Sequence, residues 1–371
     1  MMRIAQVAPL YESVPPKLYG GTERVVFHLT EELVRMGHAV TLLASGDSQT
    51  SARLISPCAR SLRLDADCRD QMAYHMILLD QVFQDLDEYD IVHFHIDYLH
   101  YPLSRASNTP HVTTLHGRLD LPELAVLYRR FRDVPLVSIS DSQRQPLPRV
   151  NWQGTVYHGL PADLYDFNAR RGSYLAFIGR ISPEKRVDRA IEIARRCQVP
   201  LKIAAKVDPT DRKYYEREIE PLLDQPGVEF IGEIGEHQKS EFLGGALALL
   251  FPIDWPEPFG LVMIESMACG TPVVAWHCGS VPEVLDEGVT GFICDSMDEA
   301  VGAVGRAGRL DRARCRRQFE SRFLVSRMAE DYLRIYQHLV DQGRSLDQSG
   351  YGRNHPGPGS VLHSGDVVAR R

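Results

Sequence analysis

Two glutamates stand eight residues apart in the second half of the chain and flank the sequence Pro-Phe-Gly. A predicted strand, Leu247–Phe251, leads into this segment, and a helix is expected to begin around Phe259 with Gly260 in its first turn. Glu257 then precedes the helix, whereas Glu265 lies within it among apolar side chains. A buried carboxylate without a partner is costly, so Glu265 must be hydrogen-bonded. The paired hydroxyls of a ribose would satisfy it, and a nearby arginine is the alternative.

Two basic residues follow the predicted strand Tyr174–Gly179. Arg180 and Lys185 occupy the turn between this strand and the next helix, where a pyrophosphate would lie. Arginine offers a bidentate fork and lysine a point charge to such a group. Lys206, at the end of the following strand, is a further candidate for the same role. Taken alone, these residues could equally be solvated cations on loops.

A pair of glycines, Gly20 and Gly21, follows the first predicted strand and opens a helix. Glycine lets the backbone approach a ligand closely, and a helix N-terminus attracts anions. A Gly-Gly turn alone is more often only a turn. The spacing G-x-G-x-x-G does not follow this strand, which disfavours an enzyme dependent on NAD.

Two short patterns suggest metal ligands but lack the necessary context. Asp65 and Asp67 form an Asp-x-Asp sequence in a polar stretch that no strand pattern precedes. His93 and His95 alternate at a strand end, without a third ligand at suitable spacing. We therefore expect no metal site and no cofactor. The arginine-rich run 306–317 is expected to be a solvated helix face, and docking to an anionic membrane surface is the alternative.

The length and composition of the chain limit the number of domains, the kind of partner and the compartment that can be expected. The chain has 371 residues, more than a single hydrophobic core usually serves, so two domains are expected. A net charge of −7 argues against a nucleic-acid partner. Seven scattered cysteines, the lack of a secretory signal and the lack of a run of about 20 apolar residues favour a cytoplasmic protein.

The elements that must position these residues alternate between strands and helices, which is typical of a parallel sheet. In the first half, strands are expected at Ile4–Pro9, Ala39–Ala44, Ile91–Phe94, Val112–Leu115, Leu136–Ser140 and Thr155–Tyr157. In the second half, they are expected at Tyr174–Gly179, Leu201–Ala205, Val228–Ile231, Leu247–Phe251, Pro272–Ala275 and Gly291–Cys294. This pattern predicts an α/β protein with two doubly wound domains facing a cleft.

The predicted domain boundaries lie where the alternation of strands and helices stops and begins again. The first domain is expected at residues 1–165 and the second at 166–322. A last helix with strong apolar spacing begins at Phe323 and the segment 323–342 contains it. The remaining residues, 343–371, are rich in Gly, Ser, Pro and Arg and are expected to be a disordered tail.

The segment around Glu257 and Glu265 resembles the retaining family-4 glycosyltransferases (glycosyl transferases group 1), which have the GT-B fold. The resemblance covers roughly residues 3–340 and includes, in the family's order, further segments of this chain. These are Gly20-Gly21, Leu115-His116-Gly117, Gly179-Arg180 with Lys185, Gly270-Thr271-Pro272-Val273-Val274-Ala275 and Gly279-Ser280-Val281-Pro282-Glu283. Only the glutamate segment is specific by itself; together the motifs are highly specific.

The resemblance implies a role for each of these residues. Arg180 and Lys185 would bind the donor diphosphate, with Lys206 assisting and Gly20 and Gly21 approaching from the first domain. Glu265 would accept from the ribose, and His116 would lie across the cleft near the transferred sugar and the acceptor. Glu257 and the N–H groups of Phe259, Gly260 and Leu261 would hold the sugar and diphosphate, and backbone around Gly232–Gly235 would contact the base.

The activity implied by the resemblance is transfer of a hexose to a hydroxyl acceptor with retention. No metal is expected, because Arg180, Lys185 and a helix N-terminus already supply positive charge to the leaving diphosphate. UDP-glucose is the expected donor and GDP-mannose the next choice; the acceptor would be a sugar, a lipid-linked molecule or another small molecule. A nucleotide-sugar 2-epimerase of the same fold and a non-catalytic sugar-nucleotide binding protein are the alternatives. The sequence carries no signal for the oligomeric state.

Overall fold

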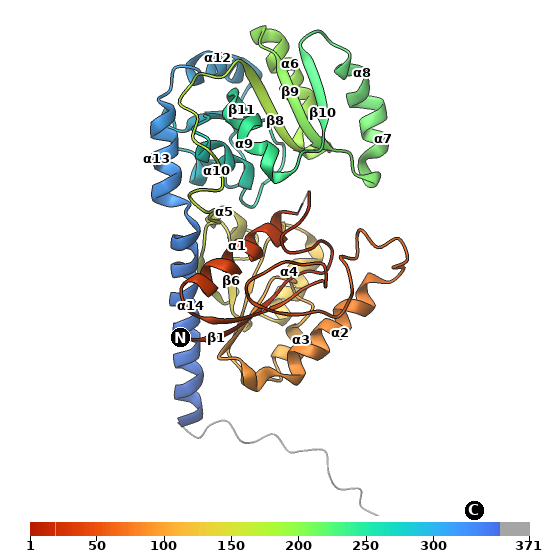
Figure 1. Cartoon of the computed structure of the whole chain (residues 1–371), viewed down its shortest axis with the longest axis vertical. Helices are drawn as coiled ribbons and strands as arrows, with labels where there is room; N and C mark the ends of the chain where they lie inside the picture. Colours follow the sequence, from red (N-terminus) through yellow and green to blue (C-terminus); the bar gives the residue numbers. More distant parts are fainter. Residues whose placement is uncertain (19, 349–371) are drawn as a thin grey trace, which may run out of the picture.

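The computed structural model describes residues 1–18 and 20–348, which form two α/β domains stacked end to end (Figure 1). The first domain holds a seven-stranded parallel sheet in the order β3-β2-β1-β4-β5-β6-β7. Its strands are β1 (Arg3–Val7), β2 (Ala39–Leu43), β3 (Arg53–Ile55), β4 (Ile91–Phe94), β5 (His111–Thr114), β6 (Leu136–Ser138) and β7 (Trp152–Thr155).

The second domain holds a six-stranded parallel sheet in the order β10-β9-β8-β11-β12-β13. Its strands are β8 (Tyr174–Arg180), β9 (Leu201–Lys206), β10 (Val228–Gly232), β11 (Ala246–Phe251), β12 (Val273–Trp276) and β13 (Gly291–Cys294). In each sheet the strand order reverses beside the first strand of the domain, between β1 and β4 and between β8 and β11. Ligands of doubly wound sheets bind outside the carboxyl ends of strands at such points.

Helices connect the strands and cover the sheets (Figure 1). In the first domain they are α1 (Gly21–Arg35), α2 (Gln71–Gln84), α3 (Tyr101–Ser104), α4 (Pro122–Arg130) and α5 (Asp141–Arg144), with a 3₁₀ turn at Leu86–Glu88. In the second they are α6 (Val187–Cys197), α7 (Arg212–Tyr214), α8 (Glu220–Leu223), α9 (Glu236–Gly244), α10 (Leu261–Ala268), α11 (Val281–Val284), α12 (Met297–Ala307) and α13 (Arg312–Arg322). Two 3₁₀ turns (Pro183–Lys185, Pro209–Asp211) and a π-helical turn (Tyr215–Ile219) complete the second domain, and α14 (Val325–Gln348) ends the described chain.

The predicted class, two doubly wound α/β domains, is confirmed, with local differences. The last strand of the first domain lies at Trp152–Thr155 rather than Thr155–Tyr157, and the short edge strand Arg53–Ile55 was not predicted. Helix α10 begins at Leu261 instead of Phe259, because Gly260 takes a left-handed conformation (φ 77°) and precedes the helix. A strand of three residues at a sheet edge is too short to show the alternation of apolar and polar residues by which a strand is recognised.

Helix α14 begins two residues after the expected start and runs along the first domain (Figure 1). Its apolar side chains, including Met328 and Tyr336, join a core with Ile4 of β1. The expected disordered tail from residue 343 is wrong for 343–348, which continue the helix. A Cβ at Gly343 would lie 3.3 Å from Pro110 Cγ, so glycine allows close packing there instead of ending the helix. Residues 349–371 of the expected tail lie outside the described residues.

Polar contacts and a shared core join the two domains. The core of the second domain extends to Ile139 of the first. Glu283 of α11 accepts hydrogen bonds from the main-chain nitrogens of Asp141 (2.7 Å) and Ser142 (2.6 Å). Arg24 of α1 forms an ion pair with Glu236 of α9. The domains are therefore held together by shared apolar packing and by specific polar contacts.

None of the helices within residues 1–18 and 20–348 combines the length and the apolar character needed to cross a membrane.

Candidate active site

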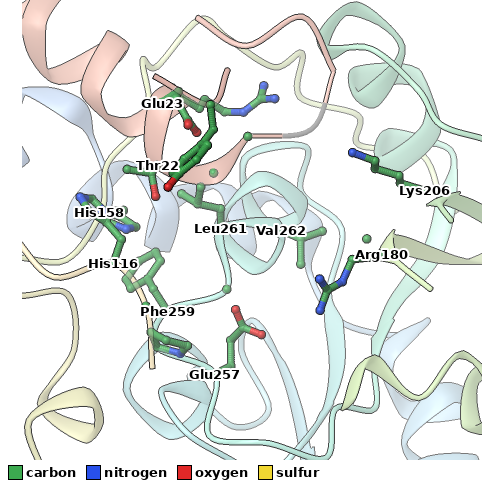
Figure 2. A pocket seen from close by; sticks show the side chains of 18 of the residues that line it. Thr22, Glu23, His116, His158, Arg180, Lys206, Glu257, Phe259, Leu261 and Val262 are labelled. Atoms are coloured by element: carbon green, nitrogen blue, oxygen red, sulfur yellow. The ribbon is translucent and has the colours of Figure 1, made fainter. Parts of the chain in front are cut away.

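A cavity of about 670 Å³ lies between the carboxyl ends of the two sheets. Its lining includes segments that follow β1, β4 and β5 in the first domain and β8, β9 and β11 in the second. Figure 2 shows Arg180 and Lys206 at one side of this cavity, with His116 and His158 at the other and Glu257 between them. All of the predicted site residues except Gly232 line it.

Two cations end neighbouring strands at the second-domain side of the cavity. Arg180 and Lys206 are partners in the parallel register of β8 and β9. The Arg180 guanidinium contacts Glu184 (2.9 Å) and Asp211 (3.3 Å), while Lys206 lies 3.9 Å from Asp208. Like charges at adjacent sheet positions repel each other. Their placement at the carboxyl ends of two strands is therefore suited to an anionic ligand.

Lys185 and Glu257 form an ion pair inside the cavity. Lys185 ends the 3₁₀ turn after β8, and its ammonium lies 5.1 Å from the centre of the Trp255 ring and 5.8 Å from that of Phe251. The indole N–H of Trp255 donates to Glu257 at 2.9 Å. The two residues that are predicted to bind the donor thus contact each other directly.

Two helix N-termini face each other across the cavity. Gly20 precedes α1, and Gly260 precedes α10. A Cβ placed on Gly21 would lie 3.8 Å from the Leu261 side chain, so the two helices begin close to each other. The first N–H groups of a helix have no partner within it, and the helix dipole is positive there. This arrangement offers donors to an anion from both domains.

Glu265 has a partner within the protein that the sequence did not identify. Lys239 of α9 donates to it at 2.8 Å, and both side chains are buried. Burial alone would raise the pKa of Glu265, but Lys239 and Arg24 reverse this, so that its pKa falls below its ordinary value. A nearby cation therefore pairs with this carboxylate, a lysine where the alternative expected an arginine, and the contact with a ribose stays a prediction.

His116 follows β5 and packs among other histidines. Its Nε2 lies 2.9 Å from Nδ1 of His95, and its ring stacks on that of His158 at 5.4 Å. Burial lowers the pKa of His116 to about 3, so this side chain is neutral at physiological pH. Its Nδ1 is buried without a hydrogen-bond partner among the described residues. His116 thus lines the cavity as a neutral ring, and its place near the transferred sugar stays a prediction.

Sequence reasoning missed several residues that line the cavity. Asp97, just after β4, adopts a left-handed backbone conformation (φ 51°), and desolvation raises its pKa to about 6. Its position after a strand end was the signal that could have identified it. His158 and Lys239 were missed because no local pattern distinguishes them from ordinary core and surface residues.

Gly232 ends β10 with φ 75°, and its neighbours Glu233 and Ile234 line the cavity in its place. The backbone around it is therefore close to the site even though Gly232 itself is not part of the lining.

Side chains of the two short sequences that suggested metal ligands form hydrogen bonds within the protein. Asp65 accepts a hydrogen bond from the Asp67 main chain on an exposed turn. Both imidazoles of the His93/His95 pair are hydrogen-bonded to protein groups. Among residues 1–18 and 20–348, no three His, Cys, Asp or Glu side chains are gathered to hold a metal ion.

The arginine-rich run 306–317 is not a uniformly solvated helix face. Arg312 is buried and donates to the main-chain oxygens of Ala246 (2.9 Å) and Gly244 (2.8 Å). Arg316 donates to the main-chain oxygen of Ala268 at 2.7 Å. These two arginines hold α13 against α10 and its surroundings. The prediction of a solvated helix face was wrong for these two residues, because the sequence does not distinguish an arginine that donates to buried carbonyls from an exposed one.

Comparisons with known proteins agree with this architecture. The family model "Glycosyltransferase Family 4" matches residues 19–152, and "Glycosyl transferases group 1" matches residues 168–307. A glycogen synthase from Mycobacterium tuberculosis is 26% identical over 90% of this chain and 94% of its own length.

Solved structures share the fold. The glycosyltransferase AviGT4 of avilamycin A biosynthesis superposes with a TM-score of 0.72 at 23% identity, covering 92% of this chain and 99% of its own. Anabaena HepE in complex with UDP-glucose gives a TM-score of 0.68 at 19% identity, covering 93% and 100%. Together with the family matches to both domains, these likenesses identify the chain as an enzyme of the family-4 glycosyltransferases with the GT-B fold.

Proposed function

We propose that this enzyme transfers a hexose from a UDP-sugar, with UDP-glucose as the preferred donor, to a hydroxyl acceptor with retention and without a metal ion. The observation that carries the proposal is the register pair Arg180 and Lys206, two cations at adjacent strand ends of the cavity. Lys185 adds a third positive charge on the same side. A diphosphate placed there would compete with the carboxylates that now pair with these cations.

The chemistry follows from where charge develops. Breaking the bond between the anomeric carbon and the phosphate leaves negative charge on the diphosphate and positive charge on the sugar ring. Arg180, Lys185 and the N-terminus of α10 are fixed donors for the leaving diphosphate, and such preorganised groups are often the largest catalytic factor. Because these groups supply positive charge from the protein, the proposal requires no divalent ion.

Retention is proposed through attack from the same face as the departing diphosphate, which then takes the acceptor's proton. Glu257 is engaged with Lys185 and Trp255, so it is not placed as a free nucleophile for a covalent bond. We assign it to the sugar hydroxyls, which it can hold once the diphosphate has taken Lys185. The family resemblance supports this assignment. Closure of the two domains over the donor would keep water from the sugar.

The acceptor is proposed to enter along the first domain. Tyr11, Met72, Asp97 and Tyr98 line the cavity there, and 46% of Met72 and 41% of Tyr98 are exposed. A carboxylate beside apolar side chains fits a hydroxyl-bearing molecule with an apolar face, such as a sugar ring or a glycosylated lipid.

Two experiments test the proposal. A thermal-shift series with UDP, GDP, ADP and TDP identifies the base, since a nucleotide at about 100 times its dissociation constant stabilises by about 2.7 kcal/mol. Turnover of UDP-glucose and GDP-mannose is then followed by NMR, with and without EDTA and with candidate acceptors.

The outcomes separate the alternatives. An α-linked product formed in EDTA from UDP-glucose supports the proposal in full. A preference for GDP-mannose overturns the proposed donor, and an inverted product overturns retention. Activity that returns only when metal is added overturns metal independence. Release of an epimerised free sugar without an acceptor identifies a 2-epimerase, and tight nucleotide binding without any turnover identifies a binding protein.

A further inference from the structure

A buried chain of hydrogen bonds connects helix α14 to His116 at the cavity wall. The side-chain amide of Gln6 donates to the Tyr336 hydroxyl at 3.0 Å, and its oxygen lies 2.9 Å from Nε2 of His95. Nδ1 of His95 in turn lies 2.9 Å from Nε2 of His116. We call Gln6, His95 and Tyr336 the relay.

A side branch holds the relay in place. Nδ1 of His93 lies 2.6 Å from the Tyr336 hydroxyl, and its Nε2 lies 2.7 Å from the Thr114 hydroxyl. That hydroxyl lies 2.9 Å from the hydroxyl of Tyr332 on α14. The members come from three strands or strand ends and one helix, and each is at most 2% exposed. Buried polar networks of this kind are strongly specified when every member is satisfied.

The relay determines where the protons lie. Because the Gln6 nitrogen is engaged with Tyr336, its oxygen faces His95 and accepts a hydrogen bond from the Nε2–H group of that ring. Nδ1 of His95 is then a lone pair and accepts from His116, whose proton lies on Nε2. Nδ1 of His116 carries no proton. Neutral imidazole has one donor and one acceptor, so each ring is fixed in a single tautomer.

This arrangement fixes the position of the His116 segment rather than freeing a base. Gln143 donates to the main-chain oxygens of both Leu115 and Gly117 at 2.8 Å, so the backbone on each side is also held. His116, Gly117 and His95 line the cavity, whereas Gln6 and Tyr336 lie behind it. A displacement of reacting groups by about 1 Å can cost a hundredfold in rate.

We propose that Gln6, His95 and Tyr336 are positioning residues that fix the ring of His116 in its Nε2–H tautomer and so set the wall of the sugar site from helix α14. The residue Phe323, just before α14, packs in the core of the second domain, while Tyr336 packs in that of the first. Docking of this helix on the first domain is therefore a condition for an ordered His116. The catalytic consequence rests on the proposed function, whereas the tautomer does not.

The test compares two substitutions at Gln6. Gln6→Met keeps the length of the side chain but removes the acceptor for His95. Gln6→Glu keeps an acceptor for the Nε2–H group of His95 and removes only the N–H donor to Tyr336, so a tautomer that persists in it is fixed by the link to His95. The matched control is Ser104→Ala, which removes a 2.5 Å hydrogen bond to His100, another buried histidine of the same domain outside the relay. Nitrogen-15 NMR of the ring of His116, melting temperature, kcat and KM are measured for each purified protein.

The expected result is that Gln6→Met loses the single tautomer of His116 and lowers kcat by about ten- to a hundredfold, with little change in donor KM. Gln6→Glu keeps the tautomer and recovers kcat relative to Gln6→Met, and Ser104→Ala alters neither. The proposal is overturned if Gln6→Met keeps the wild-type tautomer, or if Ser104→Ala lowers kcat as much. If the wild-type enzyme shows no transfer, the proposed function fails, and the NMR comparison still decides whether the relay exists.

Discussion

Lys185 and Glu257 are ion-paired within the cavity, although 72 positions separate them in the sequence. One follows β8 and the other follows β11, the two strands that meet where the strand order reverses. Binding of a donor diphosphate to Lys185 would compete with Glu257 for the same ammonium. Donor binding and the release of Glu257 for sugar hydroxyls are thereby linked in the proposed reaction.

Arg180→Ala is expected to lower kcat by a factor on the order of 10²–10³, because it removes a fixed donor from the group whose charge grows in the transition state. Arg180→Lys should recover only part of this loss, since a point charge lacks the bidentate fork. Steady-state kinetics and melting curves on the same preparations provide the measurement.

Arg189→Ala is the matched control for that series. Its guanidinium also pairs with a carboxylate, Asp254 at 3.1 Å, but it does not line the cavity. A near-wild-type kcat in Arg180→Ala, or an equal loss in Arg189→Ala, would contradict the assignment of the diphosphate to this strand end.

Glu265 and Lys239 allow stability to be separated from donor binding. Removing Glu265 leaves the buried Lys239 with only its longer contact to Glu236, at 3.6 Å, and breaking a buried ion pair typically costs about 3–5 kcal/mol. Glu265→Met should therefore lower the free energy of unfolding strongly, and Glu265→Met with Lys239→Met should restore most of it. If Glu265 binds the ribose, donor KM stays raised in the double variant.

Urea unfolding and donor kinetics on the two single variants and the double variant complete this cycle. A wild-type donor KM in the stable double variant would show that Glu265 has only the structural role.

Glu283→Ala is expected to loosen the contact between the domains. It removes the acceptor for the main-chain nitrogens of Asp141 and Ser142. Because domain closure excludes water from the site, the ratio of donor hydrolysis to transfer should rise, together with the radius of gyration in small-angle scattering. Glu287→Ala removes a comparable bond, to the nitrogen of Ile293 at 2.8 Å within one domain, and should leave both quantities unchanged.

Asp97→Asn should stabilise the protein at neutral pH and lower its activity. The surrounding protein raises the pKa of Asp97 to about 6, above its ordinary value, so ionisation opposes folding as the pH rises through this range. Because the Asp97 side chain is exposed, solvent screens its charge and the effect on stability should be small. The variant should have a higher melting temperature than the wild type above about pH 7, and the difference should shrink as the pH falls toward about 4. A melting temperature below that of the wild type at neutral pH would contradict this account.

Sequence reasoning predicted most of the strands because each one is a continuous apolar run, which is typical of strands buried on both faces. It located the cavity lining for the same reason: Arg180, Lys206 and His116 stand where such runs end, and strand ends of one sheet share an edge. The predicted helix ends were wrong where a single residue decides them. Gly260 lies before α10 rather than inside it, and Gly343 lies inside α14 rather than after it.

What the sequence by itself determined is the fold class, the division into two domains and the residue types at the strand ends. Only the tertiary structure decided their partners: Lys239 for Glu265, Glu257 for Lys185 and the relay for His116. Strand and helix periodicities are set by neighbours along the chain, so they can be recognised from local patterns. A hydrogen bond or ion pair between residues far apart in sequence depends instead on how whole elements pack, and that information is not present in any local spacing.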